Sequence, residues 1–186
     1  MKLTNFLIIL GLIIFCNSKL FAQFQKDESG NPSLTAEYSN DLLQQEFENI
    51  KGGVLNLEDY NGKIVVLDFW QTWCKPCLKG FEGLQKAKLE WQDKIEIIAV
   101  SPDLYYKDNE LLPILDKEDK ILEFISKKNY PFQYVFAEEL SKELQLKIIP
   151  YKIVIAPDGK IIESKSGFGD ADKEYKYLNS LVKEYF

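Results

Sequence analysis

The chain has 186 residues, of which 46% are apolar and 28% are charged, the composition of one soluble globular domain with a sizeable core. Its formal charge is -6, and its 23 basic residues are all lysines, with no arginine and no histidine. An acidic chain without a basic stripe argues against nucleic-acid binding. The absence of histidine excludes Ser-His-Asp and Cys-His catalysis.

The N-terminus has the pattern of an export signal. A short basic start precedes the apolar residues 6–15, and small residues within 18–22 offer a cleavage site. We therefore expect residues 1–22 to be a signal peptide and the mature protein to reach the periplasm or cell envelope. Two alternatives stay open, a membrane anchor through residues 6–15 and a lipoprotein at Cys16, although an apolar stretch of about ten residues is short for a membrane span.

The first part of the mature chain leads up to a buried strand. Residues 23–45 are polar and turn-rich, and we expect them to be a spacer before a domain over residues 46–186. Short stretches of apolar residues on either side of two glycines predict a small hairpin over residues 47–57. The nearly continuous apolar residues 64–70 predict a central strand buried on both faces, interrupted by Asp68.

The remaining elements alternate between helix and strand. Apolar residues recur at helical spacing over 76–91, and residues 95–100 predict a second strand, which together make a parallel βαβ unit. A long charged connection is expected over 101–119. The elements expected after it are a helix at 120–128, a strand at 132–136, a helix at 138–146, a hairpin formed by 152–155 and 160–162, and an amphipathic helix at 172–185.

Cys74 and Cys77 would be the only cysteines after removal of the signal. Cys74 stands where a helix should begin, and Cys77 lies one turn along it. A helix N-terminus stabilises the thiolate, which is the nucleophile of disulfide exchange. A structural disulfide that closes a loop of two intervening residues would constrain the unfolded chain very little, so the pair predicts a catalytic role. In this role Cys74 attacks and Cys77 resolves the mixed disulfide. Lys75 adds positive charge, and Pro76 suits the first turn of a helix.

Half of a zinc site is the structural alternative for a Cys-x-x-Cys pair. Zinc needs four ligands, and the sequence offers no second cysteine pair and no histidine. We therefore expect no metal, and no cofactor besides the redox-active disulfide itself.

The residues around the cysteines resemble a known family. The segment 68–77, Asp-Phe-Trp-Gln-Thr-Trp-Cys-Lys-Pro-Cys, resembles the active-site segment of thioredoxin-fold proteins. The approach at 61–67, together with Ile-Pro at 149–150 and Pro-Asp-Gly-Lys at 157–160, is similar to the exported TlpA/ResA-type branch, and the similarity covers about residues 47–185. It implies an α/β thioredoxin fold: a mixed central sheet flanked by helices, with an N-terminal β-hairpin and an inserted strand–helix element.

The resemblance also implies roles for single residues. Pro150 matches the family's cis-proline, which packs beside the disulfide and presents backbone to an extended peptide. Asp68 matches a buried acid that accepts the proton of Cys77, with a solvent-facing strand residue as the alternative. Trp73 is either a partly exposed aromatic beside the thiols or a packing residue. The residues expected to contact substrate are Trp73, Lys75, Pro76, Ile149 and Pro150.

The chain departs from this family at three positions. Gly80 and Glu82 stand where many members carry a glutamate and a proline, so the family's acid is missing there. Glu82 could substitute, but it points to a different part of the helix turn. Tyr151 follows Pro150 where a small threonine is common, and it either narrows the peptide groove or packs in the core.

The sequence therefore predicts a monomeric thiol–disulfide oxidoreductase that acts on protein thiols and disulfides and binds no nucleic acid, with an upstream membrane electron donor as a further candidate partner. Two alternatives stay open. A peroxide-reducing enzyme of the same fold is disfavoured, because Gln71 replaces the threonine expected three residues before the cysteine and no arginine can polarise peroxide. The other is a non-enzymatic binding module in which the pair is vestigial.

Overall fold

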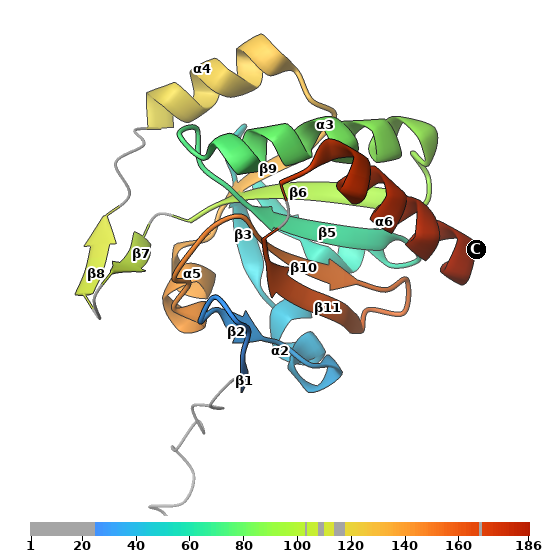
Figure 1. The fold of residues 1–186 in the computed structure, drawn as a ribbon, viewed down its shortest axis with the longest axis horizontal. Coiled ribbons are helices and arrows are strands. Elements are labelled where there is room, and N and C mark those ends of the chain that lie inside the picture. Colours follow the sequence, from blue (N-terminus) through green and yellow to red (C-terminus); the bar gives the residue numbers. More distant parts are fainter. Residues whose placement is uncertain (1–24, 103, 108–109, 114–117, 168) are drawn as a thin grey trace, which may run out of the picture.

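Figure 1 shows a computed structural model of the protein, which describes residues 25–102, 104–107, 110–113, 118–167 and 169–186. The expected signal peptide, with its two alternatives of an anchor and a lipoprotein cysteine, lies outside these residues. Within the ranges given, no helix is both long enough and apolar enough to cross a membrane.

A mixed seven-stranded sheet forms the centre of the molecule, in the order β11-β10-β5-β6-β9-β3-β4. The middle strands β5, β6 and β9 are parallel, and the strands on both sides of them are antiparallel. This arrangement confirms the expected α/β fold. The strands are β3 (Glu46–Asn49), β4 (Val54–Asn56), β5 (Ile64–Phe69), β6 (Ile95–Ser101), β9 (Gln133–Phe136), β10 (Tyr151–Ile155) and β11 (Ile161–Ser166).

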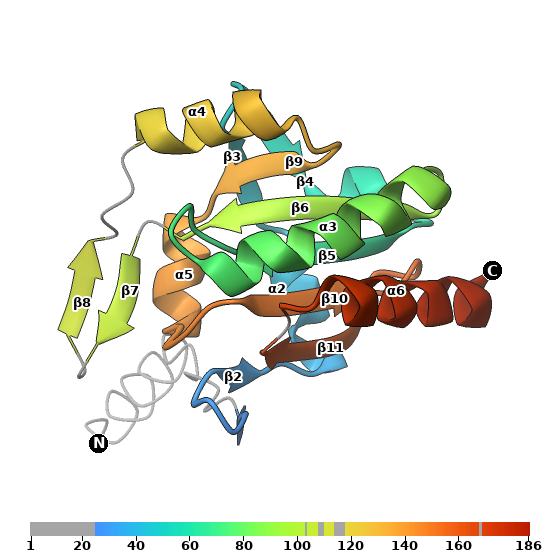
Figure 2. The same ribbon diagram turned by 45° about the horizontal axis from the view of Figure 1, so that its top comes forward.

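Helices cover both faces of this sheet (Figures 1 and 2). On one face lie α3 (Lys75–Glu90), α4 (Glu118–Lys128) and α6 (Ala171–Tyr185). On the other lie α2 (Ser39–Leu43) and α5 (Glu138–Leu144), with the short 3-10 helices η2 (Ala36–Tyr38) and η3 (Leu57–Tyr60).

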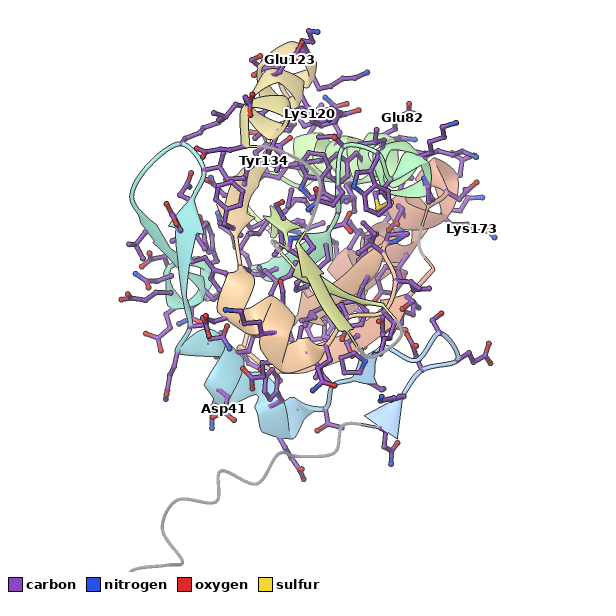
Figure 3. The ribbon with its side chains drawn as sticks, turned by 90° about the vertical axis from the view of Figure 1, so that its left-hand side faces the viewer. Asp41, Glu82, Lys120, Glu123, Tyr134 and Lys173 are labelled. Atoms are coloured by element: carbon purple, nitrogen blue, oxygen red, sulfur yellow. A yellow bond between two sulfur atoms is a disulfide. The ribbon has the colours of Figure 1, made fainter. Side chains whose placement is uncertain are left out.

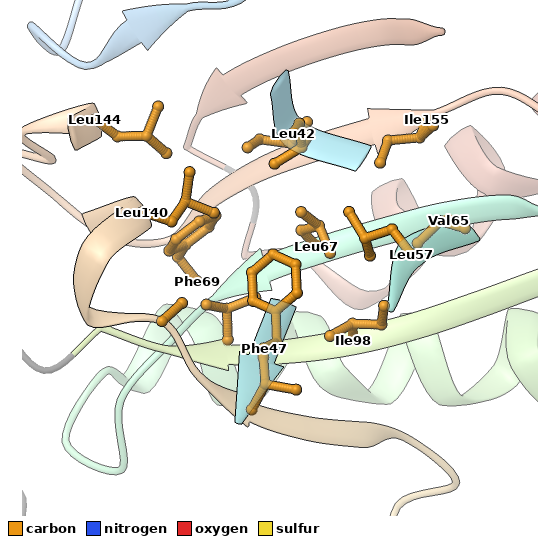
Figure 4. Packing of buried hydrophobic residues seen from close by; sticks show 14 of the residues in the cluster. Leu42, Phe47, Leu57, Val65, Leu67, Phe69, Ile98, Leu140, Leu144 and Ile155 are labelled. Carbon is orange, nitrogen blue, oxygen red and sulfur yellow. The ribbon is translucent and has the colours of Figure 1, made fainter. Parts of the chain in front are cut away.

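Successive side chains of β5 and β10 point to opposite faces, as in any strand. Val65, Leu67 and Phe69 belong to the cluster under α2 and α5, part of which is shown in Figure 4. Ile64 and Val66 belong instead to the cluster under α3 and α6. The same alternation turns the side chains of Asp68 and Lys152 toward α3 and α6.

The segment expected to be a polar spacer packs against the domain. It forms β1 (Gln25–Lys26), β2 (Pro32–Ser33), η2 and α2, and it buries Leu34, Tyr38 and Leu42 in the core. Asn31 is fully buried, and its amide donates to the carbonyl oxygen of Ile148 at 2.8 Å. The average composition of this stretch is polar, but its few apolar residues fall where they cover the sheet.

The long connection expected at 101–119 also contains regular structure. β7 (Leu104–Lys107) and β8 (Glu110–Pro113) pair antiparallel as a separate two-stranded sheet, which extends beyond the main body in Figure 1. High charge and two prolines hide this hairpin in the sequence, because they interrupt the alternation of apolar and polar residues by which a strand is predicted.

Candidate active site

Cys74 and Cys77 form a disulfide at the start of α3. Cys74 is the N-cap residue of the helix, and its Sγ accepts a hydrogen bond from the backbone N–H of Cys77 at 3.3 Å. Pro76 lies in the first turn. Its missing N–H costs no hydrogen bond there, because the first N–H groups of a helix have no acceptor within the helix. The first sulfur therefore sits at the positive end of a sixteen-residue helix, as the spacing predicts.

The disulfide is recessed beneath a partly apolar surface. Cys74 is 3% exposed and Cys77 is 1% exposed, whereas Trp73 beside them is 57% exposed. Lys75 and Pro76 are exposed as well. Trp73 is therefore an outward-facing aromatic rather than a core residue.

A second segment meets the start of α3 at a groove. The Ile149–Pro150 peptide bond is cis, and Pro150 is buried while Ile149 is half-buried. Pro150 and Pro76 together line a cavity of about 680 Å³. Residues of β11, α6 and the loop between them complete the lining: Lys165, Ser166, Gly167, Gly169, Asp170, Lys173 and Tyr177.

Asp68 lies on β5 under α3, and its side chain is fully buried. The Nζ atom of Lys152, on the neighbouring strand β10, is 3.3 Å from its Oδ1. Burial raises the pKa of the Asp68 carboxyl, and the nearby Lys152 charge opposes this rise without cancelling it. The solvent-facing alternative for Asp68 is thus wrong.

The structure adds two residues to this site that the sequence did not single out. Lys152 makes a second ion pair, 2.8 Å from Nζ to Oε1 of Glu174 on α6, and both side chains are almost completely buried. Burial raises the pKa of Glu174 to about 7. A signal for Lys152 exists, since it is the charged residue inside the apolar strand 151–155. Glu174 lies four residues before the buried Leu178, so it falls on the apolar face of the final helix.

Two glycines of α3 let α6 approach this region closely. A Cβ atom added at Gly83 would collide with the carbonyl oxygen of Ala171, and one added at Gly80 would lie 3.2 Å from Oε1 of Glu174. Glu82 is exposed and points outward from α3, as Figure 3 shows. It does not replace the missing acid.

The side chains of Tyr151 and Gln71 both have structural roles within the fold. The ring of Tyr151 lies 5.6 Å from that of Phe69, and its hydroxyl donates to the carbonyl oxygen of Pro32 at 2.8 Å. Tyr151 therefore packs in the core rather than narrowing the groove. The Gln71 amide donates to Ser101 Oγ at 2.9 Å and to the Pro102 carbonyl oxygen at 3.0 Å, which joins the end of β5 to the end of β6.

No group of three or more histidine, cysteine, aspartate or glutamate side chains suited to a metal ion occurs among the residues whose placement is given. What the site contains is a disulfide at a helix N-terminus, a cis-proline beside its groove and a buried carboxyl behind it. These features on a mixed, helix-flanked sheet define a thioredoxin-fold protein that carries out thiol–disulfide exchange.

The chain belongs to the AhpC/TSA family, whose model matches residues 39–164. It is a thiol–disulfide oxidoreductase similar in sequence to proteins named ResA. The thiol-disulfide oxidoreductase ResA of Bacillus thuringiensis is 24% identical over 177 residues, which cover 94% of each chain. ResA of Oceanobacillus iheyensis is 30% identical over 145 residues, covering 76% of this chain and 69% of that protein.

Solved structures share the fold. A secreted disulfide oxidoreductase of Mycobacterium tuberculosis, described as homologous to Escherichia coli DsbE, superposes with a TM-score of 0.60 at 16% identity. The match covers 76% of this chain and 99% of that one. At this level of identity the likeness establishes the thioredoxin-like fold.

Proposed function

We propose that this oxidoreductase exchanges its Cys74–Cys77 pair with protein substrates in the cell envelope. The observation that carries the proposal is the position of Cys74, which caps α3 while the cis-Pro150 segment borders the adjacent groove. An extended client chain would pair with the backbone at Ile149 and contact the exposed Trp73, Lys75 and Pro76. The envelope location rests on the sequence pattern of residues 1–22.

The reaction starts from the reduced pair. The Cys74 thiolate attacks one sulfur of a client disulfide, a Cys74–client disulfide forms, and the second client sulfur leaves as a thiolate that takes a proton from water. Cys77 then gives its proton to the Asp68 carboxylate and attacks Cys74 Sγ. The mixed disulfide breaks, the client leaves with both sulfurs reduced, and two electrons have passed from the pair to the client. The reverse sequence oxidises a client dithiol.

Asp68 is suited to this role by its surroundings. It lies on the same face of the sheet as α3, and the next residue in the strand, Phe69, places its carbonyl oxygen 4.0 Å from Cys77 Sγ. A carboxylate that is disfavoured by burial is a stronger base than one in water. The raised pKa of Asp68 therefore favours uptake of the Cys77 proton.

Reduction of insulin disulfides tests the proposal. With dithiothreitol as electron source, the wild-type protein should accelerate insulin precipitation, and Cys74→Ser should lose this acceleration. Cys74 and Cys77 lie in the core, but serine is close to cysteine in size, so both Cys→Ser variants should remain folded by circular dichroism. An insulin rate unchanged by Cys74→Ser would support a binding module with a vestigial pair, and rapid peroxide consumption would support the peroxide-reducing alternative.

A further inference from the structure

Glu174 is a buried acid that the exchange steps above do not use. It comes from α6, at the far end of the sequence from Asp68, yet it shares the Lys152 ammonium with that residue. The three side chains are at most 2% exposed, so they form one buried triad of two acids and one base. With all three ionised the triad carries an excess negative charge, which a buried site disfavours.

Glu174 reaches the triad because α3 has a notch at Gly80. Gly80 lies one helical turn beyond Cys77, and only a hydrogen atom projects from it on the side facing α6. The carboxylate of Glu174 fills this space: a Cβ at position 80 would lie 3.2 Å from its Oε1 and 3.7 Å from Cα of Gly169. The backbone contact at Gly83 holds α6 close enough for this placement.

We propose that Glu174 is a positioning residue for the resolving step: by holding Lys152 from the notch at Gly80, it divides the lysine's charge between two acids and keeps Asp68 basic enough to take the proton of Cys77. This inference rests on the proposed function, and it makes Glu174 a residue on which the rate of the resolving step depends. Glu174 thereby places an acid beside the active-site helix from α6, where residue 80 of α3 itself carries none.

The direction of the effect follows from the charges that face Glu174. Lys152 on β10 and Lys165 on β11 lower its pKa, Asp68 on β5 raises it, and burial raises it most. On the same helix, burial raises the pKa of Tyr177 most, and the charges of Glu163 and Glu174 add to this rise. If Glu174 becomes neutral, the whole charge of Lys152 acts on Asp68. The Asp68 carboxylate is then a weaker base than it is in the wild-type protein.

The test uses the full chain with Cys16→Ser, in which Cys74 and Cys77 are the two remaining cysteines, and glutathione disulfide as the probe. Reduced protein reacts first to a Cys74–glutathione mixed disulfide and then, through Cys77, to the closed pair with release of a second glutathione. The rate of this second release is measured from pH 5 to 9. In Glu174→Gln its midpoint should move downward by about 1 pH unit, the low end of what a neighbouring charge produces, and the rate above the midpoint should fall.

Two further variants separate positioning from stability. Glu184→Gln makes the same chemical change at an exposed position of α6, and it should follow the wild-type profile. Gly80→Glu combined with Glu174→Ala returns a carboxylate to the notch from α3, and it should move the midpoint back toward wild type relative to Glu174→Ala alone. A folded Glu174→Gln protein with the wild-type profile, or a double variant without recovery, would overturn the proposal.

The wild-type protein offers a measurement that needs no substitution. Carboxyl carbon NMR should show that the titration midpoint of Glu174 rises when the disulfide is reduced, because the Cys74 thiolate then adds a negative charge at the start of the neighbouring helix α3. Equal midpoints in the two redox states would overturn the proposal. If wild-type protein fails to accelerate insulin reduction, the proposed function itself fails, a result distinct from either of these.

Discussion

Lys152 carries an ammonium group into an interior built from the apolar side chains of β5 and β10. The cost of burying it is offset by two carboxylates, one at 3.3 Å on Asp68 and one at 2.8 Å on Glu174. Removing the lysine takes the ion-pair partner from both acids, so the folded state must protonate them or open to water. Lys152 therefore connects stability and exchange chemistry at a single residue.

We predict that Lys152→Ala lowers the free energy of unfolding at pH 7 by about 3–5 kcal/mol, the usual cost of breaking a buried ion pair. Urea denaturation followed by circular dichroism gives the value. Lys176→Ala, at an exposed position of α6, is the matched control and should unfold like the wild type. Equal stability of the two variants would show that Lys152 is not held by the buried acids.

The packing of α3 on α6 is the feature that positions the triad at the element scale. It depends on Gly83, where no side chain fits beneath the Ala171 carbonyl oxygen. It depends less on Gly80, where a Cβ atom would come closest to the end of the Glu174 side chain, at 3.2 Å, and would meet the backbone of Gly169 only at 3.7 Å. The two glycines should therefore respond differently to the same substitution.

Gly83→Ala should destabilise the protein by about 1–3 kcal/mol through overpacking. Gly80→Ala gains up to about 1 kcal/mol of helix propensity, which compensates for a small displacement of Glu174, so it should stay close to the wild type. Thermal unfolding of the two variants measures this difference. If Gly83→Ala were as stable as Gly80→Ala, the close approach of the helices would not be required.

Local patterns in the sequence predicted most elements that surround the disulfide. The apolar strand 64–70, the helix after Cys74 and the hairpin around residues 51–53 follow from periodicity and turn residues, and all of them are present. The cis bond before Pro150 is expected only from the family resemblance, because residue spacing does not show whether a peptide bond is cis or trans.

The parts that the sequence did not predict depend on contacts between distant segments. Lys152 stands within an apolar strand and Glu174 on the apolar face of a helix, but their pairing emerges only when the fold brings β10, β5 and α6 together. The segment 23–45 looks polar on average, and its role emerges only when Leu34 and Leu42 meet the sheet. Such tertiary contacts are not encoded in the local pattern from which elements are predicted.

For the whole molecule, the buried acids determine how stability depends on pH. Folding raises the pKa of Glu174 from 4.5 to about 7 and raises that of Asp68 as well. The folded state therefore binds more protons than the unfolded state within this interval. The stability contributed by these groups is fully present below about pH 4.5 and is lost as pH rises toward 7.

We predict that the free energy of unfolding falls between pH 4.5 and 7, by at most about 1.4 kcal/mol per pH unit for each proton involved. Urea titrations at several pH values give the slope. Glu174→Gln should reduce this slope, whereas Glu184→Gln should preserve it. A wild-type stability that rises across this interval would contradict the assignment of buried, proton-binding acids.

The most direct measurement captures the mixed disulfide itself. Reduced Cys77→Ser protein is mixed with a disulfide-bonded client such as insulin, quenched with acid and analysed by intact mass. We predict one client chain attached through Cys74 when both variants also carry Cys16→Ser, and only a trace of adduct with Cys74→Ser, because Cys77 lies one turn inside α3 rather than at its N-cap. Equal adduct on the two variants, or none on Cys77→Ser, would contradict attack by Cys74 and resolution by Cys77.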